Sequence, residues 1–223
     1  MARQIFIGLV TEGTTDVRFF RSIVERTFFQ VAYECCKGEI EVIVEELKDV
    51  KKGDSFTEFA INASLAGIEQ MGAMTIVIHA DSDVDTYKER FNNKFQPAIE
   101  MLKSYDDNDN YCHHITPLIP VKMMEAWMLA DKELFKSEIN TKMTDSELGI
   151  ARNPESIADP KTVIEEAIRI STEHLPKRRH RLSISDLYGV IGAAIPLEAL
   201  SKLTSYKMFK EEVYKAYAYL NYV

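Results

Sequence analysis

Met74 to Ala80 (MTIVIHA) runs without a break into Asp81 to Asp85 (DSDVD), and this junction decides the fold. A short, almost continuous apolar run predicts a β-strand that is covered on both faces of a sheet. Gln4 to Thr11 (QIFIGLVT) is a run of the same kind, and it leads into Glu12 to Asp16 (EGTTD). Both predicted strands therefore end in acidic residues.

Strand-like and helix-like segments alternate through the first half of the chain. The stretches between the apolar runs have apolar side chains at helical spacing, which indicates crossover helices. This order predicts an α/β fold with a Rossmann-like parallel sheet and helices on both faces. The expected strands are Gln4–Thr11, Glu39–Val44, Met74–Ala80 and His114–Pro120, and the expected helices are Asp16–Phe29, 56–66 and Thr86–Ser104.

The second half of the chain has a different pattern. We expect residues 1–121 to form the α/β core and residues 122–223 to form a helical C-terminal extension that packs on it. Apolar periodicity predicts three helices in the extension, whereas a polar segment with two X-Pro pairs predicts a loop. The expected helices are Met123–Ala130, Lys161–Glu173 and Ser205–Leu220, and the expected loop is Lys136–Asp159.

Composition narrows the classes of protein to consider. The chain has 223 residues, of which 46% are hydrophobic and 28% charged, so it can bury a sizeable core. A net charge of -8 excludes a general basic sheath for nucleic acid. Three cysteines without a C-x-x-C pair predict neither a disulfide framework nor a zinc site. No apolar run reaches membrane-spanning length, and the chain starts directly on strand-like residues, so we expect a cytoplasmic protein.

The acids at the two strand ends are the strongest candidates for chemistry. If the first and third strands are neighbours, Glu12, Asp81 and Asp83 converge at the carboxyl edge of the sheet. Asp81 and Asp83 are two residues apart and point the same way on an extended chain. Close carboxylates repel one another unless a cation lies between them, and hard oxygen ligands favour Mg²⁺ or Mn²⁺. The competing interpretation is that such acids are solvated or cap the next helix, which we expect for Asp85.

These two motifs resemble those of the Toprim domain, which topoisomerases, bacterial primases, recombination proteins and OLD-type nucleases share. That family has a Glu after its first strand, often as E-G-x-x-D, and an Asp-x-Asp after its third. The resemblance covers the first half of the chain in the right order. It implies that Glu12 transfers protons or binds metal, that Asp81 and Asp83 are catalytic acids that hold Mg²⁺, and that Asp16 holds a second ion.

Motifs in the second half are similar to those of uncharacterised Toprim-related bacterial proteins, relatives of OLD nucleases. The matching stretches are Pro120 to Asp131 (PVKMMEAWMLAD), Asn153 to Glu155 (NPE) and Asp159 to Lys161 (DPK). Those proteins are often encoded beside ABC- or AAA-type ATPases in anti-phage loci. The resemblance implies a nuclease-like partner of such an ATPase in antiviral defence.

Several other charged residues have two interpretations each. Glu125 lies on an almost wholly apolar helical segment, where it either joins the metal site or belongs to a polar stripe. Lys122 and Lys161 either neutralise a phosphate or are ordinary surface lysines. A basic run either follows a nucleic-acid backbone or forms a solvated turn between helices. That run contains Lys177, Arg178, Arg179 and Arg181.

We therefore expect Mg²⁺- or Mn²⁺-dependent hydrolysis of phosphodiester bonds in DNA or RNA, with reactivity in the acidic residues. The chain has no P-loop motif, so any ATPase activity would belong to a partner. The alternative is a non-catalytic Toprim-like subunit that regulates or scaffolds a partner ATPase. The sequence is compatible with a homodimer.

Overall fold

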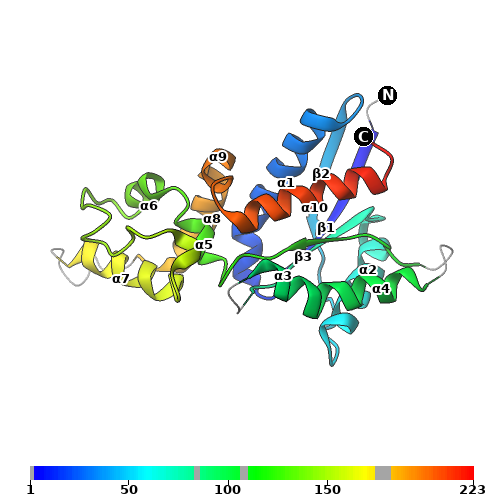
Figure 1. Ribbon diagram of the computed structural model, residues 1–223, viewed down its shortest axis with the longest axis horizontal. Helices are drawn as coiled ribbons and strands as arrows, with labels where there is room; N and C mark the ends of the chain where they lie inside the picture. The colour runs from blue at the N-terminus through cyan, green and yellow to red at the C-terminus, as the bar shows by residue number, and fades with distance from the viewer. Residues whose placement is uncertain (1–2, 83–85, 106–109, 174–181) are drawn as a thin grey trace.

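A four-stranded sheet organises the chain in a computed structural model that describes residues 3–82, 86–105, 110–173 and 182–223 (Figure 1). The strands are all parallel, in the order β2-β1-β3-β4, and helices flank the sheet. The predicted α/β class with a Rossmann-like parallel sheet is confirmed. The strands are β1 (Arg3–Val10), β2 (Ile40–Glu46), β3 (Thr75–His79) and β4 (Ile115–Leu118).

The strand order places a switch point between β1 and β3. The chain leaves β1 toward β2 and then crosses back to β3 on the other side of β1, where Ile7 pairs with Thr75 and Val10 with Ile78. The connections after β1 and β3 therefore diverge and leave a crevice at the carboxyl ends of these strands, where α/β sheets bind ligands. The condition for convergence of the two acidic motifs is met, because β1 and β3 are neighbours.

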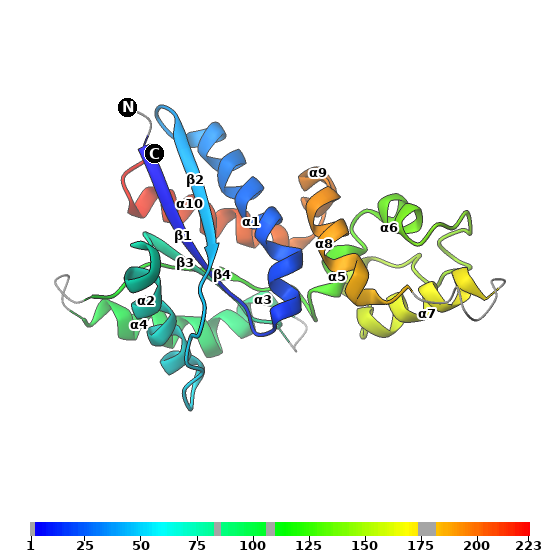
Figure 2. The ribbon, with the colours of Figure 1, turned by 180° about the vertical axis from the view of Figure 1, so that it is seen from behind.

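Helices cover both faces of the sheet (Figure 2). α1 (Thr14–Cys35) and α10 (Thr204–Tyr219) pack over one face in a core that includes Ile7 and Val77. α2 (Phe56–Met71) and α4 (Gln96–Lys103) pack over the other face with Ile76 and Ile78. Successive residues of β3 point to opposite faces, which explains why its whole sequence is apolar.

The connection from β3 to β4 differs from the single helix expected at Thr86–Ser104. It contains α3 (Tyr87–Arg90), a π-helical turn η1 (Phe91–Phe95) and then α4. Pro97 lacks an amide hydrogen and cannot donate to a residue one turn earlier, so a change in helical pattern ahead of it has a physical reason.

The second half adds helices that extend to one side of the sheet before α10 returns across it (Figure 1). The loop expected at Lys136–Asp159 instead contains the end of one helix and a short 3-10 turn, and the helices at α8 and α9 had no sequence-based prediction. These elements are α5 (Glu125–Met128), α6 (Lys132–Glu138), η2 (Pro154–Ser156), α7 (Pro160–Thr172), α8 (Ile184–Ala194) and α9 (Leu197–Leu200).

The two halves share one hydrophobic core. Trp127 of α5 is fully buried against Phe20 of α1 and Tyr206 of α10. The Tyr206 hydroxyl lies 3.1 Å from the Thr27 hydroxyl, and the Tyr217 hydroxyl donates to the Phe28 carbonyl. The boundary drawn at residue 121 thus falls within continuous packing, and it stays a prediction. Among the helices that the structure describes, none is long and apolar enough to cross a membrane.

Gly192 on α8 lies directly against the backbone of α1. A Cβ at this position would collide with the Phe19 carbonyl oxygen and lie 2.8 Å from its Cα. We expect Gly192→Ala to lower the free energy of unfolding by about 1–3 kcal/mol, because backbone atoms cannot rotate away. Gly189 on the same helix has nothing within 4 Å of the added atom, so Gly189→Ala should stabilise the protein by about 0.5–1 kcal/mol. Urea denaturation of both variants measures this contrast, and equal losses would contradict it.

Candidate functional site

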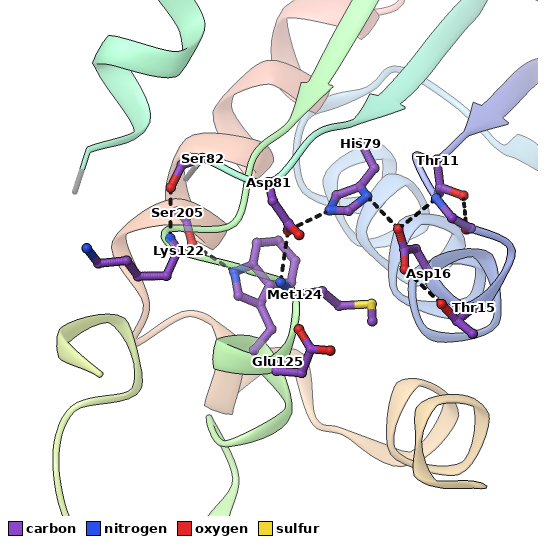
Figure 3. A network of polar contacts seen from close by, with 12 residues as sticks. Thr11, Thr15, Asp16, His79, Asp81, Ser82, Lys122, Met124, Glu125 and Ser205 are labelled. Carbon is purple, nitrogen blue, oxygen red and sulfur yellow. Dashed lines mark hydrogen bonds and ion pairs between the residues drawn. The ribbon is translucent and has the colours of Figure 1, made fainter. Parts of the chain in front are cut away.

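The two acidic motifs meet at the carboxyl edge of β1 and β3 (Figure 3). Glu12 comes from the turn between β1 and α1, Asp16 comes from the first turn of α1, and Asp81 comes two residues after β3 ends. Asp83 lies outside the described residues, as do Lys177, Arg178, Arg179 and Arg181. The predictions for those five positions stay predictions.

His79 joins the two acidic turns. Its imidazole is completely buried between Asp16 and Asp81, whose side chains are 16% and 28% exposed (Figure 3). Nε2 lies 3.1 Å from Asp81 Oδ1 in a hydrogen bond, and Nδ1 lies 3.3 Å from Asp16 Oδ2. The Nδ1 contact falls outside hydrogen-bond geometry, so it is mainly an attraction between charges.

His79 carries a positive charge at neutral pH. Burial by itself lowers the pKa of an imidazole, but the interactions with Asp16 and Asp81 outweigh it and raise the pKa of His79 to about 9. The protonated ring offsets the repulsion that two neighbouring carboxylates would otherwise suffer. A buried cation therefore links the two turns that the sequence predicted to converge.

Asp16 is engaged on both oxygens at the start of α1. Oδ2 accepts from the Gly13 amide at 3.1 Å, and Oδ1 accepts from the Thr15 hydroxyl at 3.2 Å. Burial would raise the pKa of Asp16, but His79 and the Gly13 amide together lower it. Gly13 is the N-cap residue of α1, and the carboxylate of Asp16 reaches back to the backbone of that cap.

Asp81 is oriented by two donors on one oxygen. Oδ1 accepts from His79 and from the Met124 amide at 3.0 Å. Next to it, the Ser82 hydroxyl accepts from the Lys122 amide at 2.8 Å, and the Ser82 amide donates to the Pro120 carbonyl. The segment after β4 thereby holds the segment after β3 in place. Oδ2 of Asp81 forms no hydrogen bond within the described residues and is available to a ligand.

Glu12 lies at the solvent-exposed side of the site. Partial loss of water raises the pKa of Glu12, and Asp81 raises it further, while His79, Lys94 and Arg90 act in the opposite direction. Its carboxylate forms no hydrogen bond or ion pair with the described part of the chain. A groove of about 520 Å³ opens beside it, with Lys52 and Lys94 on its walls.

Glu125 approaches the same region from α5. It is 6% exposed, and its Oε1 accepts a hydrogen bond of 2.7 Å from the Tyr188 hydroxyl of α8. Burial raises the pKa of Glu125 and Asp81 adds to this, whereas Tyr188 and Lys161 lower it. The charge of Asp81 thus acts on Glu125, and Tyr188 supplies the hydrogen-bond donor that a buried carboxylate needs.

Sequence reasoning missed His79 and Tyr188. At the level of sequence, His79 is predicted only as part of an apolar strand. Residues two apart on a strand point to the same side, and this rule alone would have placed the side chains of His79 and Asp81 together. No local pattern pointed to Tyr188, because it lies 63 positions after Glu125.

Glu12 and Asp81 are the residues best placed to hold a divalent cation. The described residues contain no group of three or more His, Cys, Asp or Glu side chains arranged as a metal site. Mg²⁺ needs only one or two carboxylates, however, because waters and substrate phosphates complete its coordination. Glu12 and the unshared oxygen of Asp81 meet that requirement, whereas Asp16 is committed to His79 and Gly13. The donor chemistry therefore fits Mg²⁺ or Mn²⁺.

Comparison with known proteins gives one match. A family model described as "Domain of unknown function (DUF4276)" matches residues 11–193, which include both acidic turns and most of the extension. No curated protein and no solved structure matches the chain significantly.

Proposed function

Because the chain belongs to the DUF4276 family, whose description names no activity, we propose a function from the site itself. The protein is a Toprim-type nuclease that hydrolyses phosphodiester bonds of DNA or RNA with Mg²⁺ or Mn²⁺. The observation that supports this most is the convergence of Glu12 and Asp81, each with carboxylate oxygen to spare, at the switch point of a parallel sheet.

Each acidic residue then has a distinct role. When bound, Mg²⁺ polarises a phosphate oxygen and lowers the pKa of a water. Asp81 presents Oδ2 to the ion in an orientation set by His79 and the Met124 amide. Glu12 would be the second carboxylate at the ion or, because partial burial raises its pKa, the group that accepts or returns a proton. Asp16 and His79 are positioning residues that hold Asp81 and the β1 turn together.

Positive charge near the site would receive the phosphate backbone. Lys52 and Lys94 line the groove beside Glu12, and Lys161 is near enough to lower the pKa of Glu125. Together with Lys122, these residues supply local cations on a chain of net charge -8, and the basic run at 177–181, which lies outside the described residues, stays a predicted nucleic-acid contact. The resemblance to Toprim-related defence proteins further supports an ABC- or AAA-type ATPase partner and an antiviral, cytoplasmic role.

One observation favours the non-catalytic alternative. His79 already neutralises Asp16 and Asp81 in part, so the two turns can stay together without a metal ion. In that case the protein would regulate or scaffold a partner ATPase. The two functions differ in whether Mn²⁺ binds to the site and whether nucleic acid is cut.

The test is cleavage of supercoiled DNA, linear DNA and RNA by the purified protein, alone and with its partner ATPase and ATP. We expect cutting with Mg²⁺ or Mn²⁺, none with EDTA, and a loss of at least about 10²-fold in Asp81→Asn, which removes a charged ligand. Titration with Mn²⁺ should show a site that Asp81→Asn weakens. Glu100→Gln, an exposed change on α4, is the control. Cleavage that survives EDTA or Asp81→Asn would contradict the assignment.

A further inference from the structure

A groove of about 660 Å³ lies between α3 and α10, next to the proposed nuclease site. Its walls include Tyr87, Phe91, Val121 and Met208, together with the carboxylate of Glu212. Val121 precedes Lys122, whose amide binds the Ser82 hydroxyl beside Asp81. The groove thus adjoins the carboxyl edge of β3, and its volume is typical of sites for small ligands or single nucleotides.

The aromatic wall consists of two rings that stack on each other. The rings of Tyr87 and Phe91 are nearly parallel, at an angle of 16° and with centroids 6.0 Å apart. Tyr87 is 7% exposed and supports the ring of Phe91, which is partly exposed and lines the groove. Aromatic side chains held in this way stack on nucleobases, whose π-faces are all suitable for such contact.

Glu212 gives the groove a buried hydrogen-bond acceptor. Only 7% of this residue is exposed, and its Oε1 accepts from Lys215 at 2.7 Å. The buried Tyr87 hydroxyl lies close enough to this carboxylate to interact with it, although the contact falls outside hydrogen-bond geometry, and no other hydrogen bond to Oε2 occurs within the described residues. Burial and the charge of Glu212 raise the pKa of Tyr87, so the phenol stays protonated.

The other carboxylate of the groove is already engaged. Glu155 accepts from the Thr204 and Ser205 amides at 2.8 Å and from the Ser205 hydroxyl at 2.6 Å. Ser205 in turn accepts from the Trp127 indole at 2.8 Å. Glu155 therefore fixes the start of α10, and Glu212 is the carboxylate with acceptor capacity to offer a ligand.

We propose that this groove binds one guanine base of the nucleic-acid substrate, stacked on the aromatic wall and paired with Glu212. The inference rests on the proposed nuclease function and names its base preference. A carboxylate only accepts hydrogen bonds, and guanine alone presents two adjacent donors, N1–H and N2–H, on one edge. Adenine and cytosine place an acceptor nitrogen beside their amino group, and uracil flanks its single N–H with two carbonyls, so each would set lone pairs against the carboxylate. Lys88 at the exposed rim would meet the phosphate.

Binding of free nucleotides tests this without any cleavage step. We expect GMP to bind the full-length protein in metal-free buffer at least tenfold more tightly than AMP, CMP or UMP by isothermal titration calorimetry. Glu212→Gln should weaken GMP binding tenfold or more, because the amide replaces one acceptor by a donor. Glu211→Gln is the matched control, since Glu211 is the exposed neighbour on the same helix. Equal binding of all four nucleotides, or equal effects of the two variants, would overturn the proposal.

A second variant and a second readout guard against a merely structural effect. Phe91→Leu keeps an apolar wall but removes a ring, and it should weaken GMP binding in a protein that still unfolds cooperatively. Mapping of cleavage ends should show guanine at one fixed position relative to the cut. If GMP binds but nucleic acid is never cut, the groove assignment stands and the nuclease assignment fails. If cutting occurs with no base preference and GMP does not bind, the nuclease assignment stands and the groove assignment fails.

Discussion

Glu12→Gln should reduce metal-dependent cleavage by about 10²–10⁴-fold, the range for loss of a general acid or base, without destabilising the protein. The folded state raises the pKa of Glu12 above its unfolded value, because partial burial and Asp81 disfavour the charged form. For an acid shifted upward, stability falls as the pH rises through its pKa. Glutamine removes this cost, so the melting temperature at pH 7 should be unchanged or higher.

Glu46→Gln is the control for this result. Glu46 is the exposed last residue of β2 and lies at the same edge of the sheet, one strand away from β1. Its replacement should leave cleavage within about twofold of wild type, because Glu46 borders the groove beside Glu12 but is not one of the acids placed at the ion. Retained activity in Glu12→Gln, or an equal loss in Glu46→Gln, would show that Glu12 has no special role.

His79→Gln should chiefly lower stability, in contrast to Glu12→Gln, which should chiefly lower cleavage. We expect a loss of about 3–5 kcal/mol in the free energy of unfolding at pH 7. Removing one member of a buried charge group leaves the others uncompensated, which costs this much in proteins. Here the remaining groups are Asp16 and Asp81, which would face each other across the vacated position. Any loss of cleavage in this variant would follow from displacement of Asp81, since His79 is fully buried.

The pH dependence of stability identifies the charge as the cause. The pKa of His79 is about 9 in the folded protein, against about 6.5 for an unperturbed imidazole. For a base shifted upward, the stabilisation is complete below pH 6.5 and is lost as the pH rises through 9. The difference in unfolding free energy between wild type and His79→Gln should therefore shrink steadily from pH 7 to pH 10. Chemical denaturation at several pH values measures it.

His114→Gln is the matched control on the adjacent strand edge. Burial lowers the pKa of His114 to about 4, so its ring is neutral from pH 7 to pH 10. Its Nδ1 contacts the Thr75 hydroxyl at 2.9 Å. This variant should lose stability by an amount that does not change over that pH range. If the difference in unfolding free energy between wild type and His79→Gln were also constant from pH 7 to pH 10, the His79 imidazole would not be a structural cation.

Local patterns were sufficient wherever neighbouring residues alone set the structure. The apolar runs at β1 and β3 are buried on both faces, and their alternation with helices permits few arrangements other than a parallel sheet. In the extension the same patterns predicted α7 and α10, but they did not predict α8 or α9. α8 has a largely apolar sequence, and Gly192 lets it pack closely against α1. Such a contact joins segments far apart in the sequence.

The sequence by itself determined the fold class and the position of Glu12, Asp16 and Asp81 at strand ends, because periodicity and strand direction are local properties. Only the tertiary structure decided what each acid contacts. His79 is a buried cation because the pairing of β1 with β3 places Asp16 on the other side of its ring from Asp81. Glu125 accepts a hydrogen bond from Tyr188 because α5 packs on α8. Contacts of this kind depend on which elements become neighbours, and that choice is made by the whole core rather than by any segment of it.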